Sequence, residues 1–337
     1  MDRIVRGKEN IDEEKWDRFV RSHPAGNVFQ RPVMHRVFED TRNYMPYVAA
    51  CVDEDGDVKG VLQGVRISNG RGPVRRMTSR VIVYGGPLVL NDDRNCISAL
   101  LKAFTAMVRK DAVYCEIRNL EVPDENIKEI FSASGFRHFP HLNIVVNAGG
   151  TEKELLKKMD PPKRRNVKKA LKKGLGFGII KKEEEIDEVY SILKGVYSKT
   201  GLPLSDISLF KVLFRNMSSD GSCRFYKAES DGRMIGVMVV LVNNNSLYEW
   251  YVGAKEEIYN MRPNEFLVWN VMLEAQREGL QFFDFGGAGK PGEEYGVRNF
   301  KKGFGGDIIE TGRFRIVFKR LPWLIGNAGI RLKKVFK

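Results

Sequence analysis

The sequence predicts an α+β fold in which one domain plan is used twice. Two short acidic turns that contain Asp-Gly, at 53–57 and 229–233, each join two strand-like segments, which is a strong signal for a β-hairpin. A helix-like segment and then a further strand follow each hairpin. The same order of elements, met twice, indicates a duplicated domain with a mixed sheet flanked by helices.

The two copies also agree in detail, because the pattern D-G-x-(V/M)-x-G-V starts at Asp55 and again at Asp231. The expected hairpin strands are 47–52 and 58–65 in the first copy, and 224–228 and 234–242 in the second. The expected helices are 97–109 and 265–277, and the closing strands are 113–117 and 281–285. Asn264 is the expected N-cap of the second helix.

The two ends of the chain fit this division. Residues 13–22 have apolar side chains at helical spacing, and so have 33–38. We expect a first domain over 1–147 and a second over 148–319, with a C-terminal helix at 320–337 packed on the first domain. Because the last 25 residues contain eight basic residues and no acidic ones, this helix could also lie on an anionic membrane surface.

The composition is that of a globular protein. Of the 337 residues, 42% are hydrophobic, and the mean hydropathy is −0.33. No window approaches the ~18 consecutive apolar residues of a membrane span, and the first ten residues lack the apolar run of a signal peptide. The four cysteines form no CxxC pair, and none is near a histidine. We therefore expect a cytoplasmic protein without a metal site.

The formal charge of +13 favours a polyanionic partner, which could be nucleic acid, anionic lipid or a phosphorylated substrate. Residues 157–173 hold nine basic residues and one acidic residue. Val167, Ala170 and Leu171 give this stretch a single apolar stripe, so the basic side chains occupy its remaining faces. A helix facing a polyanion is expected here, and a solvated helix is the alternative.

The stretch 281–306 is the most distinctive of the chain. It starts as an aromatic strand and continues as a glycine-rich loop, which ends on Phe300 and Lys301 just before Gly303-Phe-Gly-Gly306. Glycines let a backbone approach a ligand closely and adopt positive φ. A lysine held in such a frame can act as a fixed positive charge. A surface loop with a solvated lysine is the alternative.

The familiar catalytic motifs are missing from the sequence. The GxGxxG match at 287–292 follows a strand but opens no helix of a βαβ unit, and 286–290 lacks the spacing of a P-loop. There is no HExxH and no GxSxG. Acyl transfer to an amine needs less: the two substrates must be positioned and the oxyanion of the tetrahedral intermediate stabilised. Phe300 and Lys301 fit that requirement.

Several motifs spread over the chain form a recognisable set. They are Phe29-Gln30, Tyr-Gly-Gly-Pro at 84–87, the basic helix 165–174, Tyr-Glu-Trp-Tyr-Val-Gly-Ala at 248–254, Arg-Pro-Asn at 262–264, Trp269, Phe-Asp-Phe-Gly-Gly at 283–287 and the Phe-Lys-x-x-Phe-Gly segment within 296–306. In this order they resemble the FemABX family of non-ribosomal peptidyltransferases along nearly the whole chain.

This resemblance implies two tandem GNAT-like domains. No insertion is long enough for a coiled-coil arm, so the short form is expected. Well-understood members transfer an amino acid from aminoacyl-tRNA to an amine of a peptidoglycan precursor, and they use no metal or other cofactor. The implied partners are therefore aminoacyl-tRNA and an amine on a cell-envelope peptide precursor, with peripheral contact at the inner face of the membrane.

The resemblance also implies roles for single residues. Lys301 would stabilise the transition state beside Phe300. The expected substrate-binding residues of the second domain are Tyr248, Tyr251, Asp284 and Arg298. The expected contacts to phosphates of tRNA or of the precursor are Lys163, Arg164, Arg165 and Lys169. Tyr251 suits an aromatic core equally well, and Asp284 could instead accept hydrogen bonds from its own glycine loop.

The chain departs from the family pattern where the acceptor would be recognised. Peptidoglycan-type members tend to have a tryptophan and a nearby lysine after the Phe-Gln motif, whereas this chain has Met34, Arg36 and Phe38. Where an Asp-Pro is common, it has Arg118-Asn119. Arg36 and Asn119 are thus the expected acceptor-binding residues of the first domain, and the identity of the acceptor stays open.

Three functions remain as hypotheses. The first is a tRNA-dependent aminoacyltransferase that forms an amide bond. The second is an N-acyltransferase that uses acyl-CoA or an acyl carrier. Its CoA-binding signature, (Q/R)-x-x-G-x-(G/A), is incomplete because Phe300 stands before Gly303 and Gly305. The third is a non-catalytic module that binds RNA or an anionic membrane through its basic helices.

Overall fold

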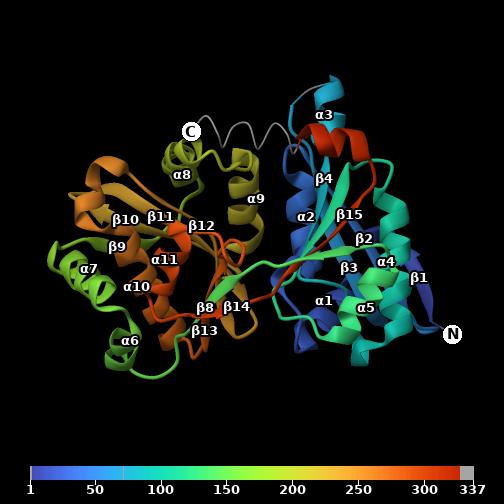
Figure 1. Ribbon diagram of the computed structural model, residues 1–337. Coiled ribbons are helices and arrows are strands. Elements are labelled where there is room, and N and C mark those ends of the chain that lie inside the picture. Colours follow the sequence, from blue (N-terminus) through green and yellow to red (C-terminus); the bar gives the residue numbers. More distant parts are fainter. Residues whose placement is uncertain (1, 71, 327–337) are drawn as a thin grey trace. The chain divides into compact units, whose positions relative to one another are not determined.

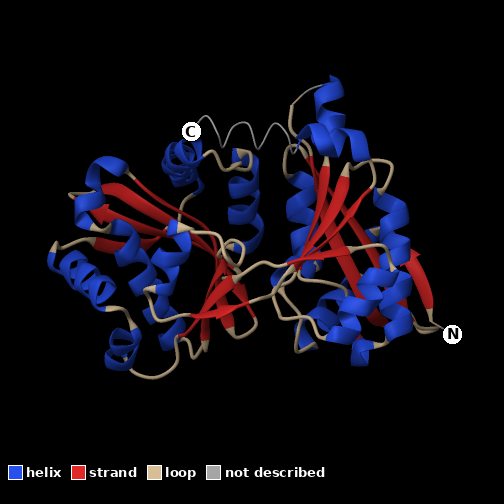
Figure 2. Ribbon diagram, in the orientation of Figure 1, coloured by secondary structure: helices blue, strands red, loops and turns tan. Residues whose placement is uncertain are grey.

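The computed structural model describes residues 2–70 and 72–326. The chain folds into two compact units. The first consists of the residues up to Pro140 together with those from Thr311 onward, and the second is His141–Glu310. Each unit is built on one mixed β-sheet, with helices packed on it (Figure 1, Figure 2). The α+β fold with two sheets flanked by helices, predicted from the repeated hairpins, is confirmed.

The sheet of the first unit has the strand order β1-β2-β3-β4-β6-β15-β7, with β5 paired to β3. Its strands are β1 (Arg3–Arg6), β2 (Tyr44–Val52), β3 (Val58–Ile67), β4 (Arg80–Tyr84), β5 (Leu88–Val89), β6 (Tyr114–Arg118), β7 (Arg137–Phe139) and β15 (Arg313–Val317). All neighbours are antiparallel except β4 and β6, which are parallel.

Helices cover both faces of this sheet. Successive side chains of β2 point to opposite faces, and those on both faces are buried. Val48 and Ala50 pack with Trp16 in one cluster, whereas Ala49 and Cys51 pack with α4 in another. The helices of the first unit are α1 (Glu13–Ser22), α2 (Pro32–Asp40), α3 (Gly72–Thr78), α4 (Arg94–Val108) and α5 (Glu125–Ala133), with 3₁₀ turns η1 (Lys8–Asn10), η2 (Val28–Gln30) and η3 (Leu90–Asp92). The helices expected at 13–22, 33–38 and 97–109 are therefore present.

The sheet of the second unit has the order β14-β8-β13-β12-β11-β10-β9. Its strands are β8 (Asn143–Asn147), β9 (Gly176–Ile179), β10 (Cys223–Ser230), β11 (Arg233–Asn243), β12 (Ser246–Ala254), β13 (Phe282–Gly287) and β14 (Asp307–Ile309). Its helices are α6 (Glu152–Lys158), α7 (Pro161–Lys172), α8 (Ile186–Thr200), α9 (Ile207–Met217), α10 (Pro263–Arg277) and α11 (Gly296–Lys302), with 3₁₀ turns η4 (Glu183–Glu185) and η5 (Glu256–Met261).

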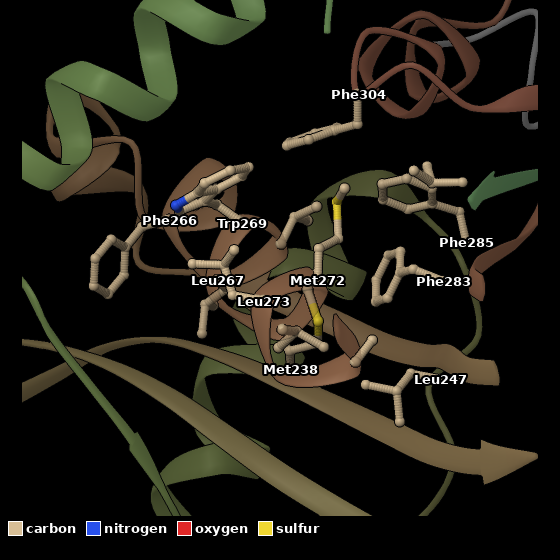
Figure 3. Packing of buried hydrophobic residues seen from close by; sticks show 14 of the residues in the cluster. Met238, Leu247, Phe266, Leu267, Trp269, Met272, Leu273, Phe283, Phe285 and Phe304 are labelled. Atoms are coloured by element: carbon tan, nitrogen blue, oxygen red, sulfur yellow. The ribbon is translucent and has the colours of Figure 1, made fainter. Parts of the chain in front are cut away.

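The core of the second unit lies between its sheet and α10. Figure 3 shows the side chains of Trp269 and Met272, from α10, converging with those of Phe283 and Phe285 from β13 and with Phe304. All five side chains are essentially buried. This packing fixes β13 and the segment that follows it, and these two carry the candidate active site.

The duplication is visible in the strand pairings of the two sheets. In each unit an antiparallel hairpin, β2–β3 or β10–β11, continues into a third antiparallel strand, β4 or β12. A long helix, α4 or α10, then leads to a strand that is parallel to the third, which is β6 or β13. The repeat inferred from Asp55 and Asp231 therefore extends to the topology of the sheets.

The units differ from the sequence-based domains because the two repeats exchange their last strands. β8 follows the first repeat in the chain but pairs with β13 and β14 of the second unit. β15 follows the second repeat but pairs with β6 and β7 of the first. The boundaries therefore lie at 140/141 and 310/311, not at 147/148 and 319/320, since an isolated strand sequence does not reveal which sheet it joins.

Glu116 holds the exchanged strand β15 in the first sheet. Its carboxylate is 97% buried and is surrounded by Arg118, Arg313 and Arg315, with an Arg315 Nε–Oε2 distance of 3.0 Å. Burial tends to raise the pKa of this carboxyl, but the combined charge of the three arginines outweighs it and holds the pKa at about 2. A carboxylate that accepts from both strands thus fixes β15 to β6.

Three local predictions need correction. Asn264 does not cap α10, because Arg262 is the N-cap residue and Pro263 starts the helix. The basic stretch 157–173 is not one helix, since α6 ends at Lys158 and the prolines after Asp160 begin α7. The glycine-rich loop does not extend to Lys301, because Gly296–Lys302, which has no glycine after its first residue, forms the short helix α11.

The C-terminal helix is described only in part. Residues 320–326 are helical, and the rest of the expected helix, 327–337, lies outside the described residues. Trp323 packs edge-on against Tyr114 of β6, with ring centroids 4.8 Å apart, so the described part rests on the first unit. Among the helices that the structure describes, none combines the length and apolar character needed to cross a membrane.

Candidate active site

The candidate site lies in the second unit, where the strands β12 and β13 separate. Their parallel ladder pairs only Ser246–Tyr248 with Phe282–Asp284 and then stops. On the other side of β12, Val239 pairs with Tyr251 while Val240 pairs with Glu249, which leaves Trp250 as the extra residue of a β-bulge. Beyond the end of the ladder, backbone groups of β13 are free to bind side chains from outside the sheet.

Lys301, from α11, occupies this position. Its ammonium donates one hydrogen bond to Phe285 O at 2.5 Å and another to Gly287 O at 3.0 Å. Oε1 of Glu249, on β12, is 3.8 Å from the same nitrogen, which is the distance of an ion pair but too long for a hydrogen bond. The third N–H of Lys301 therefore has no hydrogen-bond acceptor within the described part of the chain.

Burial shifts the pKa of each charged group in this site. Lys301 is 8% exposed and Glu249 is 7% exposed. Burial lowers the pKa of Lys301, raises that of Glu249 to about 7, and raises that of Asp284 to about 6. In each case the nearby opposite charge opposes the effect of burial without cancelling it. Two carboxyl groups with pKa values near neutrality, Glu249 and Asp284, and a lysine with a lowered pKa are thus gathered at one place.

Glu249 was not among the residues expected from the sequence. One carboxylate oxygen, Oε2, is buried and has no hydrogen-bond partner among the described residues. The available signal was an acidic residue at an inward position of an otherwise apolar and aromatic strand. A buried carboxylate oxygen without a hydrogen-bond partner is costly to maintain, which makes Glu249 a candidate functional group.

Phe300 is held next to Lys301 by aromatic and cationic contacts. Its ring packs against Phe304 with centroids 5.4 Å apart, and Lys163 Nζ lies 3.7 Å from its centroid. Lys163 also forms an ion pair with Glu265 Oε1 at 3.2 Å, and its side chain is only 11% exposed. Lys163 therefore points inward and fixes α7 to α11, rather than lying with the exposed basic residues.

Two of the expected substrate-binding residues organise the backbone around Lys301. Arg298 donates to Ala288 O and Glu293 O, at 2.8 and 2.9 Å, and also to Lys290 O, so it fixes the loop between β13 and α11. Asp284 accepts a hydrogen bond from Gly286 N at 2.6 Å, as the alternative interpretation of this residue expected.

The Tyr248 hydroxyl lies close to the turn that β13 makes at Gly286. Gly286 has φ of +64°, and a Cβ at this position would be 3.0 Å from the Tyr248 hydroxyl oxygen. A side chain at position 286 would thus be strained in its backbone conformation and would also press on the tyrosine. Glycine lets β13 turn sharply past Tyr248, which brings Gly287 O to the Lys301 ammonium.

Tyr251 lies apart from this group. Its ring packs against Phe210 of α9 and Tyr197 of α8, with centroids 4.9 and 5.8 Å apart, and its hydroxyl lies 2.8 Å from Ser205 Oγ. The bulge at Trp250 sends Tyr251 and Glu249 to opposite faces of the sheet, because their partners Val239 and Val240 are consecutive. The contacts of Tyr251 are those of an aromatic core residue.

The exposed basic residues expected to bind phosphates lie on α7. Arg165 and Lys169 are exposed, Arg164 is partly exposed, and none of the three forms an ion pair among the described residues. Lys168 and Lys172 are exposed on the same helix. Apart from Lys163, the helix therefore presents unpaired positive charge, whereas its Val167 and Ala170 are buried in the core.

Arg36 and Asn119, the two expected residues of the first unit, contact different parts of that unit. Arg36 forms an ion pair with Glu13 and lines a groove of about 870 Å³ between α1 and α2. Asn119 donates to Thr311 O at 3.0 Å. The motifs around them meet in the structure. The Phe29 ring stacks on Tyr84 at 4.5 Å, and Gln30 Nε2 donates to Gly86 O at 2.9 Å.

Comparisons with known proteins identify relatives of this chain. Residues 162–302 match a family model described as an acetyltransferase (GNAT) domain. Lipid II:glycine glycyltransferases of Staphylococcus epidermidis and Staphylococcus aureus are 21% and 20% identical to the chain, and each match covers 97% of both sequences. The crystal structure of FemX has the same fold, with a TM-score of 0.73, 18% identity, and coverage of 94% of this chain and 98% of that one.

Along nearly its whole length the chain is similar to proteins of the FemABX type. The resemblance found in its motifs is thereby confirmed, and so is its class as an acyltransferase of FemABX type. Among the described residues the longest helices, α4, α8 and α10, have 15 residues each, so the chain has no long helical arm there.

Proposed function

We propose that this protein is an aminoacyltransferase that moves an amino acid from aminoacyl-tRNA to an amine of a cell-envelope peptide precursor. The observation that carries the proposal is the hydrogen bonding of the Lys301 ammonium. Two of its N–H groups are committed to the backbone of β13, and the third has no acceptor among the described residues. The names of the staphylococcal relatives, which transfer glycine to lipid II, support this choice of reaction.

The reaction requires a group such as Lys301. The nitrogen of the acceptor amine attacks the ester carbonyl carbon of the aminoacyl-tRNA, and the carbonyl oxygen becomes an oxyanion. The third N–H of the ammonium donates to that oxygen. When the intermediate collapses, the C–N bond remains, the C–O bond to the ribose breaks, and the ribose hydroxyl is regained with a proton. The two carbonyls that hold Lys301 keep its ammonium in a fixed position during these steps.

Glu249 is the proposed acceptor of the proton that the attacking amine loses. A base works best when its pKa lies near the pH of the reaction, and burial brings the pKa of Glu249 to about 7. Its Oε2 is unpaired among the described residues, so it has a free lone pair for that proton. Lys301, 3.8 Å away, stabilises the carboxylate before transfer.

The exposed basic side chains of α7 are the proposed contacts to the tRNA backbone. We expect an Arg165→Ala/Lys169→Ala double variant to bind tRNA more weakly, because both side chains are exposed and unpaired among the described residues. Removal of two phosphate contacts lowers the dependence of log K on log salt concentration by roughly 2. Fluorescence titration of charged tRNA across a salt series measures both quantities.

A matched control removes the same charge elsewhere. Lys102 and Arg137 are exposed in the first unit, and a Lys102→Ala/Arg137→Ala variant keeps the salt dependence of the wild type if α7 is the contact. Equal losses in both double variants would show that net charge alone governs the binding, and the proposed role of α7 would be wrong.

The second candidate is an N-acyltransferase that uses acyl-CoA, which the match of residues 162–302 to a GNAT domain favours. Titration of the same protein with acyl-CoA separates the two. Saturable binding of acyl-CoA, together with tRNA binding that does not respond to charging, would favour the second candidate.

The first unit is the proposed binding site of the acceptor. Arg36 and Asn119 are the proposed acceptor-binding residues, because they replace the residues usual in family members that act on peptidoglycan precursors. The proposal places the enzyme in the cytoplasm, where aminoacyl-tRNA is present, and at the inner face of the membrane when the acceptor is lipid-linked.

A further inference from the structure

A basic pocket of about 430 Å³ lies in the first unit, at the ends of β3 and α3. It is lined by Arg66, Ser68, Arg75, Arg76, Ser79, Lys110, Asp111 and Lys319. Five of these eight side chains are cationic and one is anionic. The single carboxylate, Asp111, is already engaged, since it accepts from the Tyr47 hydroxyl at 3.0 Å and lies 3.9 Å from Arg66 Nη1. The pocket therefore has a surplus of positive charge.

Two of the five cations of this pocket are engaged, since Arg66 forms an ion pair with Asp111 and Lys319 Nζ donates to Lys110 O at 2.8 Å, whereas the side chains of Arg75 and Arg76 are unpaired among the described residues. Arg66 Nε is buried and has no hydrogen-bond partner within the part of the chain that the structure describes. The hydroxyls of Ser68 and Ser79 lie 3.1 Å apart, and Ser79 Oγ donates to Arg75 O at 2.8 Å, so both hydroxyl protons are already engaged. The guanidinium groups are thus the groups of this pocket that can bind phosphate oxygens.

Exposed apolar side chains flank the same pocket. Val74 and Met77, on α3, are 54% and 43% exposed. Leu321, Leu324 and Ile325, in the helical segment that directly follows Lys319, are 70%, 63% and 53% exposed. Met45, the cross-strand partner of Arg66, is 45% exposed. Six of the fourteen large exposed hydrophobic side chains of the described residues thus belong to segments that border one pocket.

The apolar side chains of the last segment are held outward by their own helix. Trp323 is anchored on Tyr114, and the Arg315 guanidinium lies 4.8 Å from the Trp323 ring centroid. With this residue turned inward, Leu321, Leu324 and Ile325 stay exposed. In Figure 1 this short red helix and α3 lie at the same end of the first unit, and the pocket is lined by Arg75 and Arg76 of α3 and by Lys319, the residue directly before the red helix.

We propose that this surface docks the protein on an anionic phospholipid bilayer, with a lipid phosphate in the pocket and the apolar side chains in the interface. Positive charge beside exposed leucine and isoleucine is the combination that binds anionic membranes. RNA would match the charge but leaves the apolar side chains in water. The inference does not depend on the reaction proposed above, because it concerns a different surface and needs neither donor nor acceptor.

Vesicle co-sedimentation of the full-length protein tests the proposal. Vesicles of phosphatidylcholine alone are compared with vesicles that also contain phosphatidylglycerol, and strong binding is expected only to the second. Each cation near such a surface contributes about fivefold to the partition coefficient, so Arg75→Ala/Arg76→Ala lowers it by about thirtyfold at low salt. Leu321→Ser/Leu324→Ser removes the binding that persists at high salt, because apolar insertion is not screened.

The control variant is Lys168→Ala/Lys172→Ala, which removes the same charge from α7 and leaves vesicle binding unchanged if the pocket is the docking site. All substituted side chains are exposed, and unchanged thermal unfolding confirms that the variants fold. Equal binding to both kinds of vesicle, or equal losses in the pocket and α7 variants, would overturn the proposal. So would an Arg75/Arg76 variant that loses tRNA binding but keeps its binding to anionic vesicles.

Discussion

Lys301→Met is expected to lower kcat for acyl transfer by about 10² to 10³, which is the usual effect of removing one donor to an oxyanion. Methionine has a side chain of similar length without the ammonium, so the volume beside Phe285 and Gly287 stays filled. The backbone carbonyls of these two residues lose their donor, which costs about 1–3 kcal/mol of stability for each buried acceptor left unpaired. Single-turnover kinetics, with circular dichroism to confirm folding, measures the effect.

The neighbouring lysine provides the matched control. Lys302 is on the same helix but exposed, so Lys302→Met removes one positive charge without touching the site. We expect its kcat to stay near that of the wild type. Lys301→Arg should not restore the rate, because a planar guanidinium does not reproduce the three donors of an ammonium in this buried position. A folded Lys301→Met protein with an unchanged kcat would contradict the proposed role of Lys301.

Glu249→Gln is expected to remove a pH dependence as well as activity. In the wild type the carboxylate is the active form of the base, so the rate should rise as the pH increases through about 7, the pKa of Glu249. Glutamine cannot accept the proton, so the rate should fall by about 10² or more and the rise near pH 7 should disappear. Measurement of the single-turnover rate from pH 5.5 to 8.5 (roughly 1.5 units on either side of neutrality) tests this.

Asp284 offers the comparison that separates the two carboxylates. Its pKa is raised to about 6, and it already accepts from Gly286 N, so Asp284→Asn should keep a rise of the rate with pH, displaced to lower pH because the charge of Asp284 helps to raise the pKa of Glu249. If the pH dependence instead disappears in Asp284→Asn and persists in Glu249→Gln, Asp284 is the base. A lower rate with an unchanged pH profile in Glu249→Gln would assign Glu249 a purely structural role.

Local signals in the sequence were enough to predict the repeated fold. The turns at Asp55 and Asp231 predict two hairpins because Asp-Gly favours the tight turns that join antiparallel strands. The helices after them follow from apolar spacing. The exchange of β8 and β15 could not be predicted in this way. Their apolar patterns indicate strands, but the sheet that each joins depends on contacts far away in the chain.

The candidate site could be predicted only in part, for a similar reason. Lys301 stood out by its motif, but its hydrogen bonds reach back 14 and 16 residues across a loop. Strand alternation alone would place Glu249 and Tyr251 on one face, and the bulge at Trp250 separates them. The charge run on α7 did not show that Lys163 turns inward to Glu265, since that partner is 102 residues away.

A transfer assay with two donors decides whether the donor is an aminoacyl-tRNA. The protein is incubated with a pool of peptidoglycan precursors and either tRNA charged with a labelled amino acid or labelled acyl-CoA. We expect label from the charged tRNA to appear in an alkali-stable amide, and we expect Lys301→Met to abolish this product. Transfer from acyl-CoA with none from any charged tRNA would show that the donor is not an aminoacyl-tRNA and would leave only the tandem fold in place.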